Sequence, residues 1–293
     1  MINYWELAKQ FPNIENQNAV SEFLLSLKLT NRSETTIRMY RSFLEQFFVM
    51  QTESFASLSS ETIYQWYCEN QGHVKERSLK VRLSILSSFY TFCVQEELIE
   101  RSLIKSRWFP RLPKSAPKYL GKEEIAKVRQ QSEKDSLRSQ TILEFMLTSG
   151  CRIGEVNRLN YADIDVDNRT ATIVGKGKKI RQVHFTEKCA ILLERYMITR
   201  KESTSPALFL SLGGERLSIS QIYRTIRSIG EKAGLKNLHP HQLRHTFATE
   251  LLAKGAELSF IGEELGHNDI ATTQIYARLL KSEIIVRYRK YMG

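Results

Sequence analysis

The stretch that most restricts how this chain can fold is a short basic segment, Arg107 to Lys118, which reads RWFPRLPKSAPK. Its three prolines exclude a continuous helix, because proline lacks the N–H donor and its ring clashes with the preceding turn. Helical apolar spacing is found on both sides of this segment. We therefore expect two domains, residues 1–106 and 119–293, joined by an extended linker at 107–118.

Composition limits the class of protein and its partners. The chain has 293 residues, 42% of them apolar, which is enough for a core in each domain. A net charge of +11 with only 26% charged residues favours a polyanionic partner, nucleic acid before membrane. The four cysteines form no C-x-x-C pair, which indicates a reduced intracellular protein. No signal peptide or membrane-spanning apolar run is found.

Residues 18–97 have the apolar spacing of four helices. Ser33 is the predicted cap of the second helix, Ser59 or Ser60 caps the third, and the fourth extends from about Lys75 to Glu97. Basic side chains gather on the second and fourth helices. A solvated face would explain them, but two basic faces in one bundle could also contact DNA phosphates. The candidate contacts in this half are Arg38, Arg41, Lys75, Arg77, Lys80 and Arg82.

The second half combines helices with a small β element, so the predicted fold is mainly α with a hairpin or small sheet (α+β). Gly150 interrupts an apolar helix, Arg152 follows in the turn, and Glu155 begins the next helix. Residues alternate in polarity on both sides of the sequence GKGKK, which predicts a β-hairpin with Lys176 at its tip. A phosphate-binding P-loop is excluded, because a strand and not a helix follows these glycines.

Further elements follow the hairpin. We expect a short strand at 207–211 and a helix capped by Ser218, whose polar side adds Arg224 and Arg227 to the candidate DNA contacts. An amphipathic helix is predicted at the end of the chain, with an apolar side made of Ile284, Ile285, Tyr288 and Tyr291.

Between residues 239 and 276, polar side chains occur where helices begin and end. Pro240 suits a first helical position, which places His241 and Arg244 in the first turn on the same side. Gly266 can end a short apolar helix, and His267 follows it directly. Tyr276 lies on a further predicted helix. This combination suits attack on a phosphodiester, because tyrosine, with a pKa of about 10, needs neighbouring positive charge to act as a nucleophile.

Each of these residues alone has a simpler interpretation. His241 and His245 have a spacing that can bind zinc, but no glutamate follows His241 and no cysteine pair is near. His267 alone would more often make a helix-end hydrogen bond. Tyr276 alone would more often be a core or interface aromatic. The joint pattern changes that balance.

The joint pattern resembles the tyrosine recombinase family, which includes the phage integrases and the Xer proteins. TSGCRIGEVNRL is similar to the family's box I, with its arginine at Arg152 and Glu155 three residues later. H-x-x-R, then LGH, then a tyrosine nine residues further on are similar to its box II. The resemblance implies that Glu155 holds an arginine or histidine in place. It implies a catalytic set of Arg152, Lys176, His241, Arg244, His267 and Tyr276.

The resemblance also implies a mechanism and partners. Tyr276 would form a 3′-phosphotyrosyl link, Lys176 would protonate the leaving 5′-oxygen, and strands would exchange through a Holliday junction without a metal or cofactor. The DNA would carry an inverted-repeat core site, with a dimer on each site and a tetramer in the synapse. The terminal helix would dock on a neighbouring protomer. The expected setting is the prokaryotic cytoplasm at the nucleoid, in dimer or co-integrate resolution or in mobile-element integration and excision.

Other functions remain open at this point. A type IB topoisomerase would use nearly the same residues, but would act as a monomer without site preference. A non-catalytic DNA-binding protein would bind a repeat without covalent capture. A metal-dependent nuclease would be stopped by a chelator.

Overall fold

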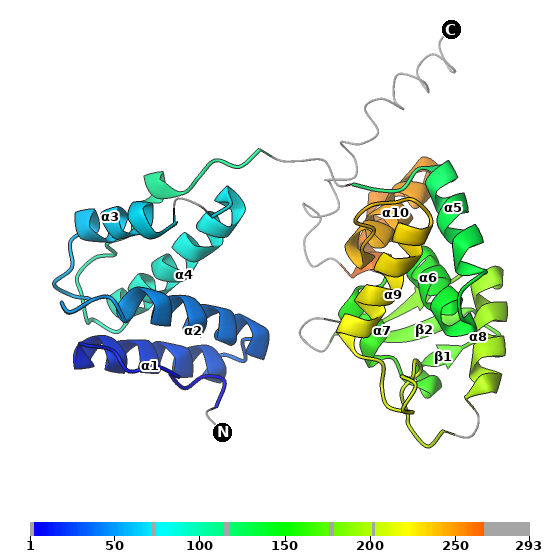
Figure 1. Ribbon diagram of the computed structural model, residues 1–293, viewed down its shortest axis with the longest axis horizontal. Helices are drawn as coiled ribbons and strands as arrows, with labels where there is room; N and C mark the ends of the chain where they lie inside the picture. The colour runs from blue at the N-terminus through cyan, green and yellow to red at the C-terminus, as the bar shows by residue number, and fades with distance from the viewer. Residues whose placement is uncertain (1–2, 72–73, 114–117, 176–178, 201–202, 267–293) are drawn as a thin grey trace, which may run out of the picture. The chain divides into compact units, whose positions relative to one another are not determined.

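A computed structural model describes residues 3–71, 74–113, 118–175, 179–200 and 203–266. The chain divides into two compact units, Met1–Lys114 and Ser115–Gly293 (Figure 1). This division falls within the segment expected to be a linker. The structure differs at the start of that segment, where Ser106–Trp108 forms a 3-10 turn and Trp108 and Phe109 pack against the core of the first unit. Burial of these two rings extends the first unit beyond residue 106.

Four helices form the first unit, as predicted: α1 (Ile14–Leu29), α2 (Glu34–Phe48), α3 (Ser60–Gln71) and α4 (Glu76–Gln95). Ser33 caps α2 by accepting a hydrogen bond from the backbone N–H of Thr36. The expected start of the first helix near residue 18 is corrected by the structure. The side chain of Asn13 accepts hydrogen bonds from the backbone N–H groups of Glu15 and Asn16, so α1 begins at Ile14.

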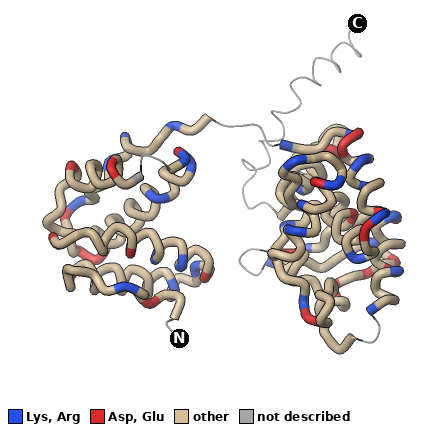
Figure 2. The backbone as a smooth tube through the Cα atoms, viewed as in Figure 1, with Lys and Arg blue, Asp and Glu red and all other residues tan. Residues whose placement is uncertain are grey.

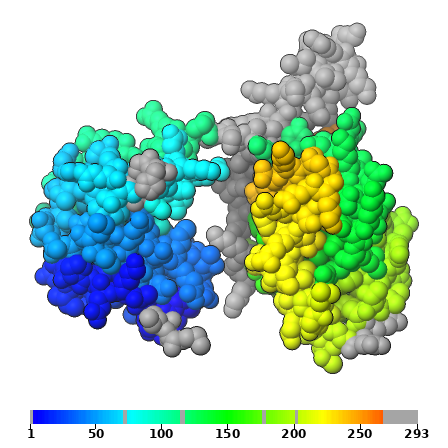
Figure 3. Space-filling view, viewed as in Figure 1, coloured from blue at the N-terminus to red at the C-terminus, as the bar shows by residue number. Residues whose placement is uncertain are grey.

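Aromatic side chains fill the core of this unit. The Phe89 ring lies edge-on to Phe23, Phe48 and Phe55, with centroid distances of 5.7, 5.2 and 5.8 Å. Phe89 itself has no exposed surface. The space-filling view shows side chains of α1 and α2 (blue) and of α3 and α4 (cyan) closing over this core on the visible face (Figure 3). Burial of such large rings supplies much of the stability of a small bundle.

The second unit packs helices around a small sheet (Figure 1). Helix α6 is its centre and contacts α5, α8, α9, α10 and β3. It contributes fully buried apolar side chains such as Ile142, Leu143 and Phe145. In the described part of this unit the helices are α5 (Lys122–Ser132), α6 (Leu137–Ser149), α7 (Ile153–Arg158), α8 (Glu187–Thr199), α9 (Ile219–Lys232), α10 (Pro240–Ala253) and α11 (Leu258–Leu265), with a 3-10 turn at Tyr161–Asp163.

The sheet is antiparallel, with strand order β1 (Ile164–Asp165), β2 (Thr170–Val174) and β3 (Ile180–His184). The predicted hairpin is confirmed by the pairing of β2 with β3, in which Ile173 faces Arg181 across the two strands. The short strand expected at 207–211 is not formed. That segment makes only isolated bridges, Asn160 to Ala207 and Leu210 to Arg216. Among the described residues, no helix is long and apolar enough to cross a membrane.

Candidate active site

The turn between α6 and α7 determines where the Arg152 side chain is positioned. Gly150 ends α6 in the left-handed region at a φ of +62°, and a Cβ on it would lie 2.3 Å from the Phe247 ring. Only glycine fits such a position without displacing its neighbour. Arg152 is the N-cap residue of α7, and its backbone N–H donates to Glu155 Oε2 at 2.8 Å. The predicted turn between two helices is therefore confirmed.

Helix α10 begins as its sequence predicts. Pro240 occupies its first position, and the ring of His239 caps it by accepting a hydrogen bond from the backbone N–H of Gln242 at 3.2 Å. His241 and Arg244 therefore lie one turn apart near the start of the helix. Arg244 is 2% exposed, so its guanidinium acts within the protein and not on an open surface.

The arginines of the two boxes converge on the carboxyl end of α11. Arg244 donates from Nη1 to the Gly150 carbonyl at 2.8 Å and from Nη2 to the Leu265 carbonyl at 2.7 Å. Arg152 donates from Nη1 to the same Leu265 carbonyl at 3.3 Å and from Nη2 to the Gly266 carbonyl at 3.5 Å. The last carbonyls of a helix lack helical partners and form the negative end of its dipole. Both guanidinium groups are thus brought together at one helix end.

Glu155 holds the cluster from the inside. This carboxylate is 3% exposed and accepts from Arg152 Nη1 at 2.9 Å and from Arg181 Nη1 and Nη2 at 3.1 and 3.0 Å. Burial alone would raise its pKa, but the hydrogen bonds from Arg181 and Arg152 outweigh burial, so the pKa of Glu155 is lowered. Glu155 is therefore a carboxylate at neutral pH, and it orients two arginines.

Arg181 is a neighbour of the site that motif reading missed. It lies on β3, its side chain is 15% exposed, and its Nε donates to the Glu264 carbonyl at 3.1 Å. An arginine in a predicted strand was the available signal, because a charged side chain in a half-buried sheet needs a partner of opposite charge. Its partner Glu155 is 26 residues earlier in the chain, and no local spacing links the two.

His241 lies at the edge of the same cluster. Its ring contacts that of His245 edge-on, with 4.2 Å between the centroids. Although part of the ring meets solvent, the pKa of His241 is lowered, first because surrounding protein removes water and then because Arg244, His239 and Arg152 are positive. A neutral ring can accept a hydrogen bond or a proton. No group of three or more metal-ligand side chains occurs among the described residues.

Several predicted site residues lie outside the described residues. These are the candidate general acid, the histidine of LGH, the candidate nucleophile and the apolar side of the terminal helix. In residue terms they are Lys176, His267, Tyr276, Ile284, Ile285, Tyr288 and Tyr291.

Arg41, one of the predicted DNA contacts, has partners within its own unit. Its Nη1 donates to the backbone carbonyls of Glu6 at 2.9 Å and of Asn3 at 3.3 Å, and its Nε lies 3.9 Å from the Glu45 carboxylate. The side chain is only 16% exposed. The amino-terminal segment folds over this side of α2, so Arg41 holds that segment, and its contact with DNA stays a prediction.

The start of α4 keeps the basic character expected of it. Lys75, Arg77 and Lys80 are exposed there, and Figure 2 shows the basic residues gathered at this end of the helix. Arg82 is half-buried, with its guanidinium 5.6 Å from the centroid of the Phe43 ring. The exposed lysines and Arg77 are therefore better placed than Arg82 to contact a phosphate backbone.

The other predicted DNA contacts are exposed, and two of them are paired. Arg38 lies 2.7 Å from Glu34, and Arg227 lies 2.8 Å from Glu231, each one turn away on its own helix. Arg224 is exposed on α9. Surface pairs of this kind are weak because solvent screens them, so a phosphate can replace the carboxylate.

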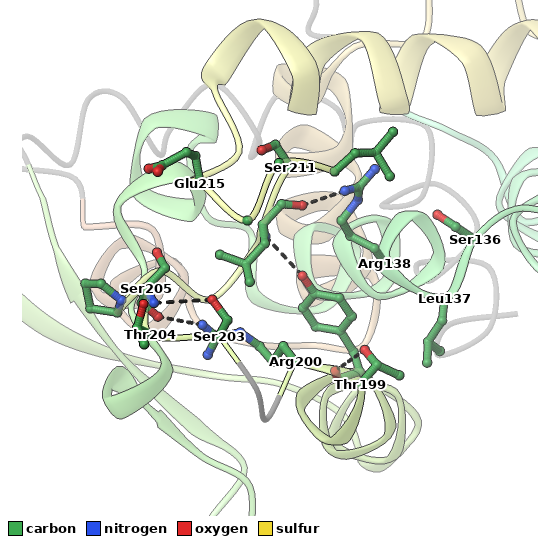
Figure 4. Close-up of a pocket in the computed structure, with 16 residues that line it drawn as sticks. Ser136, Leu137, Arg138, Thr199, Arg200, Ser203, Thr204, Ser205, Ser211 and Glu215 are labelled. Atoms are coloured by element: carbon green, nitrogen blue, oxygen red, sulfur yellow. Dashed lines mark hydrogen bonds between the residues drawn. The ribbon is translucent and has the colours of Figure 1, made fainter.

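An open pocket of about 990 Å³ lies elsewhere in the second unit (Figure 4). The side chains of Arg138 and Arg200 in this pocket bind backbone carbonyls of the loop that lines it. Arg138 donates to the Leu210 carbonyl, and Arg200 donates to the Ser205 carbonyl at 2.7 Å. Of the predicted catalytic residues, the three that the structure describes, Arg152, His241 and Arg244, do not line this pocket. Its size therefore does not make it the candidate active site.

Comparison with known proteins shows the family to which this chain belongs. The Phage integrase family matches residues 118–283, and the phage integrase N-terminal SAM-like domain matches residues 20–97. Tyrosine recombinase XerA of Pyrococcus horikoshii is 32% identical over 275 residues, 92% of each chain. Tyrosine recombinase XerC of Oceanobacillus iheyensis is 32% identical over 277 residues, 89% of this chain and 90% of that protein.

Among solved structures, the XerH site-specific recombinase bound to its palindromic difH substrate, in a post-cleavage complex, superposes with a TM-score of 0.77. The two sequences are 21% identical, and the match covers 100% of this chain and 92% of that chain. This similarity supports the two-unit fold, and the family matches and the two sequence relatives establish kinship. The chain therefore belongs to the phage integrase family and is a tyrosine-type site-specific recombinase, a DNA strand transferase.

Proposed function

We propose that this chain cuts and rejoins DNA with Tyr276 as the nucleophile. The observation that carries the proposal is the convergence of Arg152 and Arg244 on the Leu265 carbonyl, beside His241. His267 follows that helix end by two residues in the sequence. Two planar guanidinium groups near one point match the oxygens of a phosphate.

In the proposed cleavage step, side chains of the protein supply the nucleophile, the charge stabilisation and the proton for the leaving group. The Tyr276 hydroxyl oxygen attacks the phosphorus, a 3′-phosphotyrosyl bond forms, and the bond from phosphorus to the 5′-oxygen breaks. Arg152, Arg244 and His267 stabilise the charge on the non-bridging oxygens. Lys176 gives its proton to the leaving 5′-oxygen. Attack by a 5′-hydroxyl of a partner strand reverses the step and transfers the strand through a Holliday junction.

His241 has a supporting role in this proposal. Its lowered pKa keeps the ring neutral near pH 7, so it can accept the proton of the attacking hydroxyl or a hydrogen bond from it. Glu155 keeps Arg152 directed at the end of α11. A buried ionic network of this kind holds its members in one arrangement, which is what a charge-stabilising site requires.

The assembly is part of the proposal. The palindromic substrate of XerH supports a target with an inverted repeat. Two protomers would bind this target, and two more would join them in a synapse. The amphipathic side of the terminal helix, made of Ile284, Ile285, Tyr288 and Tyr291, would dock on the neighbouring protomer. We place the reaction in the cytoplasm at the nucleoid, in dimer or co-integrate resolution or in mobile-element integration and excision.

Covalent capture tests the proposal. Duplexes bound by the protein are first selected from a pool with inverted-repeat half-sites. The selected duplex is then nicked close to the cleavage position, so that the short leaving fragment diffuses away and the protein stays attached. With EDTA present, we expect an SDS-resistant adduct with the native protein and none with Tyr276→Phe.

Tyr223→Phe is a matched control, because Tyr223 is an exposed tyrosine on α9 outside the proposed site, and this variant should form the adduct. Failure of the native protein to form an adduct on DNA that it demonstrably binds would overturn the proposal in favour of a binding protein. Relaxation of supercoiled plasmid that lacks the selected site would favour a topoisomerase. Loss of cleavage in EDTA would favour a metal-dependent nuclease.

A further inference from the structure

Arg181 has three strong interactions that no motif of the candidate site accounts for. Its Nη1 and Nη2 atoms grip both oxygens of Glu155, and its Nε donates to the Glu264 carbonyl near the end of α11. The planar guanidinium suits this task, because its donors lie in a fixed fork. One side chain of β3 thereby joins the start of α7 to the end of α11.

Two glycines show how closely the backbone surrounds this guanidinium. A Cβ on Gly266 would lie 3.0 Å from Arg181 Nε and 3.1 Å from its Cζ, and a Cβ on Gly175 would lie 3.4 Å from Nη1. Gly266 directly precedes His267, and Gly175 directly precedes Lys176 in the sequence. Arg181 therefore packs against the backbone just before two of the proposed catalytic residues.

The neighbouring residues of β3 strengthen this connection. His184 Nδ1 lies 2.7 Å from Glu264 Oε1, and the Glu264 side chain is only 7% exposed. Glu264 thus makes hydrogen bonds to two residues of β3. Its backbone carbonyl accepts from Arg181, and its carboxylate bonds to the His184 ring. The last turn of α11 is held to the hairpin by polar bonds that have defined geometry, and not by apolar packing alone.

We propose that Arg181 is a positioning residue for DNA cleavage, which sets the relative placement of Arg152, the backbone at Gly175 and the end of α11. This inference rests on the proposed function. Arg181 acts through Glu155 and through the end of α11, and does not touch the phosphate. Its removal leaves Glu155 with one arginine in place of two, and it frees the Glu264 carbonyl.

The consequence follows from how Glu155 is shared. Arg152 binds Glu155 with one Nη atom and the Leu265 carbonyl with the same atom, so its orientation depends on both partners. Without Arg181, Arg152 is drawn toward the vacated carboxylate oxygen and away from the helix end. A displacement of about 1 Å in such a group can lower a rate on the order of 100-fold.

The test compares single-turnover cleavage of the nicked duplex by Arg181→Gln, Arg181→Lys and the native protein. We expect Arg181→Gln to bind the duplex with unchanged affinity and to cleave it about 10- to 100-fold more slowly. Arg181→Lys should recover part of the rate, because a lysine can reach one oxygen of Glu155 but cannot also serve the Glu264 carbonyl.

Arg129→Gln is the matched control. Arg129 grips both oxygens of the buried Glu144 at 2.9 and 2.8 Å in the same unit, away from the candidate site. Its loss should lower stability as Arg181→Gln does, yet leave the cleavage rate unchanged. A rate loss in Arg129→Gln as large as that in Arg181→Gln would mean that any weakening of the unit slows cleavage, and would overturn the inference.

Two further readouts separate positioning from general stability. In a Glu155→Gln background, Arg181→Gln should lower the cleavage rate far less than it does in the native background, because the two residues act through one contact. The acid limb of the rate should also move to higher pH in Arg181→Gln, because the hydrogen bonds that lower the pKa of Glu155 are lost. Among the described residues, Arg152 and Cys151 are the other ionisable groups facing Glu155, and burial raises the pKa of Cys151 to about 12, outside the acid range.

The result separates the two proposals. An adduct with the native protein and an equal rate in Arg181→Gln would overturn the inference alone. Additive effects of the Glu155 and Arg181 substitutions would do the same. No adduct with any protein, on DNA that is bound, would overturn the proposed function and this inference with it.

Discussion

Replacing Glu155 by glutamine tests the centre of the arginine network. Glu155 accepts four hydrogen bonds, two from Arg152 and two from Arg181. Glutamine is nearly the same size but keeps one acceptor oxygen, and its amide nitrogen would face two donors. The substitution therefore removes about half of these bonds and the buried negative charge, with little change in packing.

The magnitude follows from the burial of each partner. Two lost charge-assisted bonds are each worth about 1.5–3 kcal/mol when buried. The Arg152 share is reduced because that side chain is 40% exposed, whereas Arg181 is 15% exposed. We expect the second unit to lose about 3 kcal/mol of unfolding free energy. That corresponds to a drop in Tm of roughly 6–12 °C.

The chain offers an internal control for the assay. All three tryptophans, Trp5, Trp66 and Trp108, belong to the first unit. Tryptophan fluorescence should therefore report an unchanged transition, while calorimetry or circular dichroism reports the loss in the second unit. Glu231→Gln serves as the surface control, because its pair with Arg227 is exposed and should contribute little to stability.

The stability difference between the native protein and Glu155→Gln should disappear at low pH. The pKa of Glu155 is lowered in the folded protein, so its contribution is complete above the pKa of the unfolded chain and is lost as pH falls through the folded value. The native protein and Glu155→Gln should therefore converge in stability toward low pH. A neutral-pH loss no larger than that of Glu231→Gln would refute the reasoning, because Glu155 would then be an ordinary surface carboxylate.

Three further predictions concern other parts of the molecule. Gly150→Ala should destabilise the second unit by about 3 kcal/mol in urea unfolding, since its Cβ would lie 2.3 Å from Phe247 in a left-handed backbone. A Phe247→Leu background should recover part of that loss. The NMR titration midpoint of the His241 ring should lie below the ordinary value of about 6.5, and a midpoint above it would contradict the assigned surroundings. Lys80→Gln should lower the salt slope of DNA binding by about 0.9, measured against Lys9→Gln as an exposed lysine outside the basic end of α4.

Helix ends were predictable because their chemistry is local. Ser33 and Ser218 cap the helices that they precede, and Pro240 occupies a first helical position, as their residue types indicate. The first helix was placed several residues late, because its cap is Asn13, which lies outside the apolar stripe used to find the helix. Residues 207–210 are apolar and buried, which is typical of a strand, but the isolated bridges at Ala207 and Leu210 do not continue into a ladder.

Contacts between distant segments could not be predicted in the same way. Arg41 lies on the polar side of α2 by spacing, but its partners Asn3 and Glu6 reach it only when the amino-terminal segment folds back. Glu155 was expected to hold an arginine, yet the sequence does not reveal that Arg181 is the second one. Helical periodicity assigns a face to each residue, and does not say which segment covers that face.

The residues that end the helices are also the residues that build the site. Gly150 ends α6 and presents its carbonyl to Arg244, while Gly266 ends α11 and presents its carbonyl to Arg152. A left-handed glycine turns the chain away and leaves the carbonyls at the helix end open to side-chain donors. Each box is therefore recognisable in sequence in part because it contains a helix-ending glycine, Gly150 in box I and Gly266 in box II. Arg181 has no such local sign, since its place depends on the hairpin folding against both stops.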